Sequence, residues 1–199
     1  MQINNRRGSF TLLELLIVIG IIGILSAITV LFISPSILNK VRASTAANDQ
    51  RRLQGAAVLY RTHAGFYPPD TDRGWDPGFA KPLPYNPDTG ADCAVNAGDC
   101  PPCPGCPSDW KTRVQNNWQG YLSVWPQNTP WNGKYDYNNW PSGNIRYGCN
   151  VPAGIYIGVQ GDYNNQNTIP ASAEQLMLDR GLDSDGCLNG ESQMLLIKL

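Results

Sequence analysis

Apolar and polar positions change character sharply in the first part of the chain. Residues 10–33 form an apolar run whose one charged side chain, Glu14, lies near its start, and a polar leader of residues 1–9 precedes it. At about 1.5 Å per residue, a helix of this length reaches roughly 36 Å, enough to cross a hydrocarbon core of roughly 30 Å. Because Arg6 and Arg7 precede the run, the pattern predicts one membrane span with a cytoplasmic N-terminus. A lone carboxylate inside such a helix is costly, which indicates a function for Glu14.

The hydrophobic helix, residues 10–35, is followed by a polar segment, residues 36–65, that keeps the helical period. Pro35 cannot donate a backbone hydrogen bond, so it predicts a kink or a local opening. We expect the helix to end near Ala64, because Gly65 is a suitable C-cap and two prolines follow. The helix face expected to be half-buried carries Ile37, Val41, Leu53, Ala56, Ala57 and Tyr60.

Residues 66–143 have the composition of a long irregular loop. Thirteen of the 16 prolines and all six tryptophans lie there. Apolar periodicity is absent, whereas Asn, Asp and Gly, which favour turns, are frequent. A loop of this length needs cross-links or a function.

The last segment, residues 144–199, predicts a small antiparallel sheet. Asn144–Cys149 and Gly154–Gln160 are short runs of β-formers on either side of an expected hairpin turn at Asn150–Ala153. Ser192–Leu199 is expected to be a closing strand, and residues 172–179 a short helical turn. The whole chain therefore predicts an α+β fold with a long N-terminal helix packed on a small sheet.

Six cysteines lie in the part of the chain expected outside the cytoplasm, where disulfides persist. The disulfide candidates are Cys93, Cys100, Cys103, Cys106, Cys149 and Cys187. We expect Cys149 to pair with Cys187 and the other four to staple the loop, although sequence alone does not select a pairing. Four thiolates in the loop could instead hold zinc or include a redox pair. The oxidising compartment, and the lack of a second CxxC at zinc-ribbon spacing, favour disulfides.

Residues 6–15, Arg-Arg-Gly-Ser-Phe-Thr-Leu-Leu-Glu-Leu, resemble the prepilin signal of type IV pilins and of secretion pseudopilins. The resemblance implies a pilin-like fold, cleavage between Ser9 and Phe10, and N-methylation of the new terminus at Phe10. The chain departs from the family's pattern, which usually has Gly before the cut. The resemblance further implies that Glu14, together with Thr11, serves assembly, with Glu14 paired to the N-terminal amine of a neighbouring subunit.

The same resemblance implies a structural subunit and no enzyme. Its expected partners are further copies in a helical filament, a prepilin peptidase and methyltransferase, an assembly ATPase, an inner-membrane platform protein, and membrane lipid before assembly. As a type IV pilin it would form an extracellular filament for adhesion, motility or DNA uptake. As a pseudopilin of a type II secretion or competence system it would stay in the periplasm or cell envelope. Residues 65–68 and 130–135 resemble pseudopilin segments, whereas the large loop favours an exposed pilin.

Residues 182–191 are dense in oxygen donors. Asp183, Asp185, Asn189 and Glu191, with backbone carbonyls, could supply a Ca²⁺ site. The resemblance supports this hypothesis, because the major pseudopilin of type II secretion carries calcium in a loop at a similar place. The alternative is an acidic turn without a ligand, and no other cofactor is expected.

The aromatic stretch of residues 125–140 is expected to build a small core beneath the loops. The alternative is an exposed stacking platform in a membrane-anchored glycan-binding module. The chain has one histidine, His63, so a nucleophile and base pair is not evident. A net charge of −1 without a basic cluster argues against a nucleic-acid-binding protein, apart from uptake of DNA by a pilus.

Overall fold

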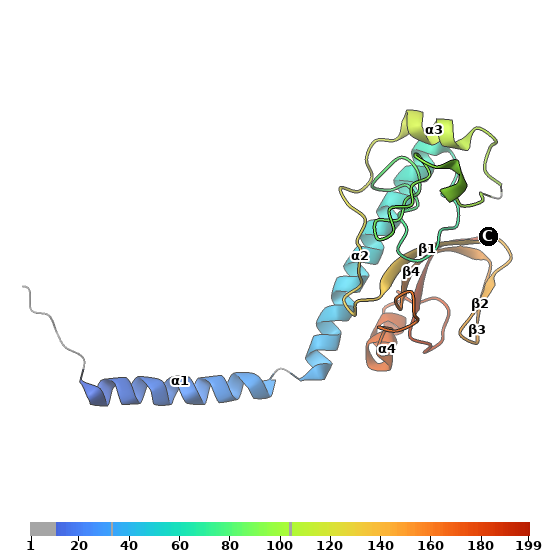
Figure 1. Cartoon of the computed structure of the whole chain (residues 1–199). Helices are drawn as coiled ribbons and strands as arrows, with labels where there is room; N and C mark the ends of the chain where they lie inside the picture. The colour runs from blue at the N-terminus through green and yellow to red at the C-terminus, as the bar shows by residue number, and fades with distance from the viewer. Residues whose placement is uncertain (1–10, 33, 104) are drawn as a thin grey trace, which may run out of the picture. The chain divides into compact units, whose positions relative to one another are not determined.

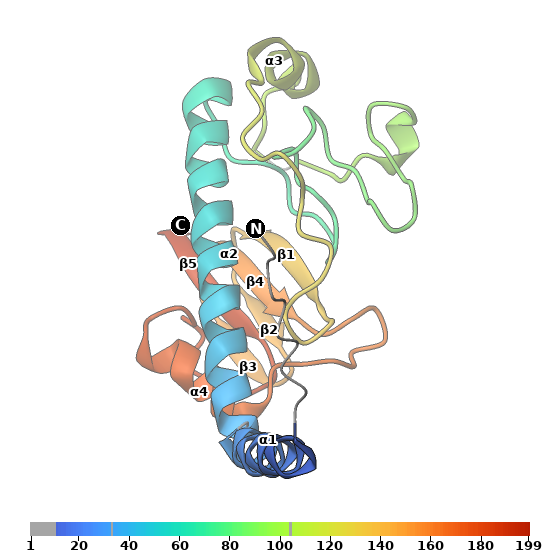
Figure 2. The same cartoon turned by 90° about the vertical axis from the view of Figure 1, so that its left-hand side faces the viewer.

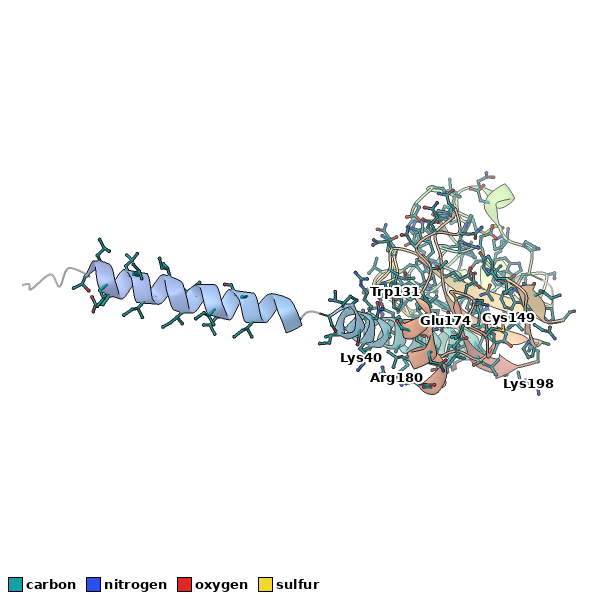
Figure 3. All side chains as sticks on the ribbon, turned by 90° about the horizontal axis from the view of Figure 1, so that it is seen from below. Lys40, Trp131, Cys149, Glu174, Arg180 and Lys198 are labelled. Carbon is teal, nitrogen blue, oxygen red and sulfur yellow. A yellow bond between two sulfur atoms is a disulfide. The ribbon has the colours of Figure 1, made fainter. Side chains whose placement is uncertain are left out.

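The structure is a computed structural model that describes residues 11–32, 34–103 and 105–199. The chain divides into two compact units, Met1–Leu38 and Asn39–Leu199. In the first unit, helix α1 covers Leu12–Phe32, and its large apolar side chains from Leu12 to Ile28 are exposed on all sides (Figure 3). In the part of the chain that the structure describes, no helix is both long enough and apolar enough to cross a membrane. The expected span of residues 10–33 includes two end residues that lie outside the described part.

Helix α2 covers Pro35–Ala64, so the expected interruption of the long helix at Pro35 is confirmed. Proline suits the first position of a helix, where its missing N–H would have no intrahelical acceptor. Gly65 ends α2 with a left-handed φ of 87°, and its N–H donates to the carbonyl of Arg61 at 2.8 Å. This glycine cap confirms the predicted helix exit.

The sheet has three antiparallel strands in the order β1-β4-β5 (Figure 1). They are β1, Lys134–Trp140, β4, Gly154–Gln160, and β5, Ser192–Lys198. The expected α+β, pilin-like architecture is thus confirmed, as are the strands at β4 and β5. Strand β1 corrects the prediction of a loop over residues 66–143. Lys134, Asp136 and Asn138 are polar and still buried, and they alternate with tyrosines in a segment whose Asn, Asp and Gly content is typical of loops.

The predicted hairpin turn at Asn150–Ala153 is wrong. The hairpin is formed by β2, Asn144–Arg146, and β3, Cys149–Val151, in a separate two-stranded sheet. Its two turn residues, Tyr147 and Gly148, have φ values of 45° and 84°. Two successive positive φ angles match the right-handed twist of the flanking strands and allow a two-residue turn.

Helix α2 packs on one face of the three-stranded sheet (Figure 2). Its buried residues are Ala43, Ala46, Ala47, Gln50, Leu53, Ala56, Ala57, Tyr60 and Ala64. The expected stripe is therefore right in its second half and wrong at Ile37 and Val41, which are 48% and 58% exposed. Alanines replace large side chains along the contact and allow the helix to approach the sheet closely. The Gln50 side chain crosses the interface and donates to the Ile157 carbonyl at 3.1 Å.

The long loop contains more order than its composition predicted. It includes a 3₁₀ turn, Ala97–Asp99, and helix α3, Trp110–Asn117, while helix α4, Ala171–Asp179, lies where a helical turn was expected. The loop is organised by the buried carboxylate of Asp76, which accepts four backbone N–H groups from residues 78–81 at 2.6–3.2 Å.

The aromatic stretch builds the core, as expected. Trp125, Trp131, Tyr135, Tyr137 and Trp140 are all buried, and Trp125 and Tyr137 both contact the ring of Phe79. Buried rings offer no stacking surface to a glycan, so the alternative of an aromatic binding platform is not supported.

Candidate functional site

The N-terminus of α1 carries a reciprocal capping arrangement. Thr11 is the residue before the helix, and its Oγ1 accepts the backbone N–H of Glu14 at 3.2 Å. In return, Glu14 Oε2 accepts the backbone N–H of Thr11 at 3.0 Å and the hydroxyl of Thr11 at 3.0 Å. This is a capping box, in which two backbone donors at the helix start are satisfied by side chains.

The capping box directs the Glu14 carboxylate back toward the start of the chain. Two residues predicted to function next to it, Ser9 and Phe10, lie outside the described residues. The structure therefore places only Thr11 and Glu14 of the predicted processing and assembly residues, and it brings those two together. A carboxylate held at a helix N-terminus is also favoured by the helix dipole.

All six cysteines form disulfides, in the pairs Cys93–Cys100, Cys103–Cys106 and Cys149–Cys187. The expected pairing of Cys149 with Cys187 is confirmed, and so is the stapling of the loop by the other four. No free thiol is present among the described residues to act as a zinc ligand.

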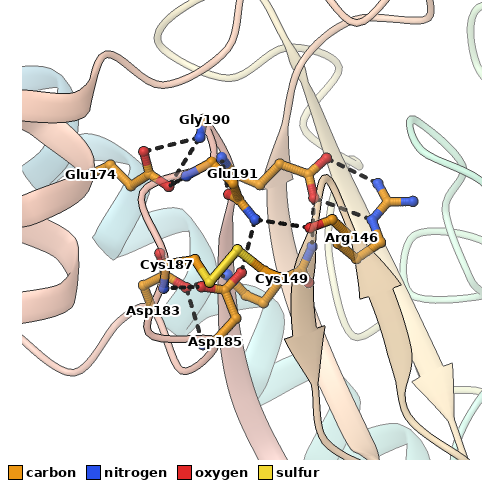
Figure 4. Close-up of a disulfide and its surroundings, with 10 residues drawn as sticks. Arg146, Cys149, Glu174, Asp183, Asp185, Cys187, Gly190 and Glu191 are labelled. Carbon is orange, nitrogen blue, oxygen red and sulfur yellow. Dashed lines mark hydrogen bonds and ion pairs between the residues drawn. A yellow bond between two sulfur atoms is a disulfide. The ribbon is translucent and has the colours of Figure 1, made fainter.

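The predicted calcium ligands lie near the disulfide of Cys149 and Cys187, but their oxygens serve the protein itself (Figure 4). Asp185 accepts the backbone N–H of Cys187 at 2.9 Å and the Asn189 amide at 3.3 Å. Glu191 is ion-paired with Arg146 at 2.9 Å. Asp183 accepts the backbone N–H of Gln193 at 3.0 Å, while its Oδ2 has no partner among the described residues.

Within the described ranges, no group of three or more His, Cys, Asp or Glu side chains is arranged to hold a metal ion. The loop is shaped instead by Glu174 of α4, which accepts the backbone N–H groups of Asn189 and Gly190 at 2.7 and 3.0 Å. The geometry therefore gives the calcium hypothesis at residues 183–191 no support, and it stays a prediction.

A polar site that the sequence did not reveal lies on the sheet face opposite α2. Alternate residues of β1 point to this face, and there Asp136 Oδ2 accepts the Gln160 amide at 2.6 Å. The side-chain Oε1 of Gln160 accepts a hydrogen bond from Arg146 at 2.9 Å, and Arg146 also forms an ion pair with Glu191. Asn138 donates to the side-chain Oε1 of Gln193 at 3.1 Å in the same layer.

This layer borders a cavity of about 230 Å³, which we call the outer-face cavity. It lies between β1, β2, β4 and the segment of residues 70–73, and most of its lining side chains are charged or amides. Burial, together with the nearby Asp70 carboxylate, raises the pKa of Asp136 to about 8, against the lowering effect of Arg146. Burial likewise raises the pKa of Asp70 to about 6.

Sequence reasoning had no signal for the outer-face cavity. Asp136 and Arg146 lie in two different sheets, and Glu191 is 45 residues beyond Arg146. Only the pairing of β1 with β4 and the fold of the β2–β3 hairpin bring these groups together. The dense polar residues of β1 were the one available hint, and they were interpreted as loop composition.

Comparison with known proteins bears on the N-terminal site. Residues 4–30 match the family described as the prokaryotic N-terminal methylation motif, the signature of type IV pilins and pseudopilins. The match covers the capping box and most of α1, so the chain carries a prepilin-type N-terminus. No curated protein matches the chain significantly. No solved structure matches it significantly either.

Proposed function

We propose that this protein is the structural subunit of a type IV pilus, made as a prepilin, cleaved before Phe10, methylated there, and polymerised into a filament. The observation that carries the proposal is the methylation motif at residues 4–30, together with a helix whose apolar side chains are exposed all round. Such an apolar surface has to be covered, first by lipid in the membrane and then by other copies in a filament.

Glu14 is the residue on which assembly depends in this proposal. Its carboxylate is already turned toward the start of the chain by Thr11. In the filament it would form an ion pair with the N-terminal amine of a neighbouring subunit. A charge pair of this kind sets the register between subunits, whereas the apolar flanks supply most of the adhesion.

The second candidate is a pseudopilin of a type II secretion or competence system. The segment of residues 65–68, Gly-Phe-Tyr-Pro, favours it, and the left-handed Gly65 that ends α2 gives that sequence a structural reason. The disulfide-stapled loop between α2 and the sheet favours the pilus, since cross-links suit a domain exposed outside the cell.

The proposal is tested by mass spectrometry of N-terminal peptides from filaments sheared off the native cells. A peptide that begins with N-methylated Phe10 is expected in the sheared fraction. The same peptide in the membrane fraction alone would favour the pseudopilin. A peptide that still begins at Met1 in both fractions would refute processing and therefore both candidates.

Substitution tests the role of Glu14. Glu14→Ala should leave the amount of membrane-associated subunit unchanged and abolish its incorporation into filaments, measured by immunoblot of sheared and membrane fractions. Gly55→Ala is the control, because nothing lies within 4 Å of the position that the new Cβ would take and the residue lies on α2, outside the apolar surface of α1. A normal filament yield from Glu14→Ala would show that the charge pair is dispensable.

A further inference from the structure

The outer-face cavity holds two buried polar atoms without a hydrogen-bond partner among the described residues, Asp136 Oδ1 and Thr71 Oγ1. Their residues are 4% and 6% exposed, and both line the cavity. A buried carboxylate oxygen without a donor or a cation is strongly penalised. A ligand in the cavity would relieve this penalty.

The neighbouring donors of the site are engaged elsewhere. Arg146 is bound to Glu191 and to Gln160, and the Gln160 amide already serves the other oxygen of Asp136. Arg73 donates to the Asp162 carbonyl at 2.8 Å, outside this group. What the cavity still offers is therefore a carboxyl oxygen and a hydroxyl, which suit a positively charged ligand that displaces the carboxyl proton.

The charged groups around the cavity favour a cation over a neutral ligand. The carboxyl groups of Asp70, Asp72 and Asp136 line it together with Arg73 and Arg146, and Arg146 is already ion-paired with Glu191 outside the lining. Because burial and the neighbouring Asp70 raise the pKa of Asp136, this carboxyl group binds a proton tightly when no other cation is present. A metal cation would take the place of that proton, whereas a neutral sugar would not.

We propose that the outer-face cavity binds a partly hydrated divalent cation of the Ca²⁺ or Mg²⁺ class through Asp136 and Thr71. Both ions take oxygen ligands, and Mg²⁺ in particular keeps several waters while binding one or two carboxylates. No ready-made group of three acidic side chains exists among the described residues, so water supplies the remaining ligands. A cavity of about 230 Å³ has room for them, since a water occupies about 30 Å³ in the liquid.

The site is separate from the predicted calcium loop, because Asp136 lies on β1 and the loop residues lie between α4 and β5. The two loci are still comparable, since Asp183 also has a buried oxygen without a partner among the described residues. Asp183→Asn is therefore a matched control for Asp136→Asn. The proposal concerns the single subunit and holds whether or not the subunit assembles into filaments.

The test is titration calorimetry of the full chain in detergent micelles with CaCl₂ and MgCl₂, with NaCl at equal ionic strength as the blank. The wild type should bind one equivalent of at least one of these divalent ions. Asp136→Asn should weaken binding at least tenfold, Thr71→Val should weaken it less, and Asp183→Asn should leave it within twofold. Absence of binding by the wild type, or equal binding by Asp136→Asn, would overturn the proposal. Loss of binding in Asp183→Asn alone would move the site to the C-terminal loop and also overturn it.

A thermal melt in EDTA checks that Asp136→Asn folds. Without a cation, this substitution replaces a buried carboxyl group whose ionisation is unfavourable and keeps an acceptor for the Gln160 amide, so its melting temperature should equal or exceed that of the wild type. Added divalent cation should then raise the melting temperature of the wild type only. If cation raised both melting temperatures equally, the ion would bind elsewhere and the proposal would fail.

Discussion

The three disulfides should contribute very unequally to stability, because they close loops of very different length. The paired cysteines are separated by 38 residues in Cys149–Cys187, by 7 in Cys93–Cys100 and by 3 in Cys103–Cys106. In the chain-entropy account, a longer closed loop removes more conformational freedom from the unfolded state. That account gives about 4 kcal/mol for the longest loop, about 2.5 kcal/mol for the middle one and about 2 kcal/mol for the shortest.

The assay is thermal unfolding of three double variants, each with both cysteines of one pair changed to serine, in the oxidised full chain. For a domain of this size, 1 kcal/mol corresponds to roughly 2–4 °C in melting temperature. The variant of Cys149 and Cys187 should therefore melt roughly 8–16 °C below the wild type. The variant of Cys103 and Cys106 should lose about half as much or less.

Changing both cysteines of a pair avoids a lone thiol that could form a wrong cross-link. Alkylation followed by mass measurement would verify that the two remaining disulfides are intact in each variant. The reasoning would be refuted if loss of Cys93–Cys100 or Cys103–Cys106 lowered the melting temperature as much as loss of Cys149–Cys187. In that case the contribution would come from native contacts around each pair and not from loop length.

Two further predictions test the interior of the globular unit. Burial raises the pKa of Asp76 to about 6 from 3.8, so the folded state binds this proton more tightly than the unfolded state does. The resulting contribution to the free energy of unfolding is about 3 kcal/mol. It is present below pH 4 and is lost as the pH rises through 6. Urea unfolding at several pH values should show this slope in the wild type relative to Asp76→Asn, and parallel curves would contradict it. Gly133→Ala should destabilise by about 3 kcal/mol or more, since its Cβ would overlap the backbone carbonyl oxygen of Gln160. Gly55→Ala, in open space on α2, should stabilise slightly. Equal melting temperatures for these two glycine variants would show that the backbone contact at β1 can yield.

The sequence was informative where one physical signal dominated. The exit of α2 could be predicted because a glycine and two prolines coincide there. Strand β4 could be predicted because most of its residues are strong β-formers, and β5 because a short apolar run follows a segment rich in turn residues. Strand β1 could not be predicted, because its polar residues are buried under the β2–β3 hairpin rather than exposed to water. For Ile37 and Val41 the error is the reverse, because these apolar side chains were expected to be half-buried and are exposed. Helical spacing alone does not say which face of the helix is covered.

The two candidate sites differ in whether a local sequence pattern can reveal them. Thr11 and Glu14 are three residues apart, so the capping box that joins them is visible in the sequence. The outer-face cavity brings together residues from Asp70 to Gln160, and the hydrogen bond between Asp70 and Asn139 alone spans 69 positions. No local pattern contains that information, and the pairing of strands has to be known first.

The Cys149–Cys187 disulfide connects the stability of the fold with the outer-face cavity. The β2–β3 hairpin carries Arg146 over the sheet, yet the small apolar cluster beneath it comprises only Trp140, Val151 and Tyr156, with Leu195 at its edge. Arg146 is also held by two hydrogen bonds to the buried Glu191, and breaking a buried ion pair is costly in free energy. The cross-link from β3 to the loop before β5 adds a covalent restraint to the same hairpin. It follows that loss of this disulfide should loosen the hairpin wall of the cavity, while the ion pair still holds Arg146 in place.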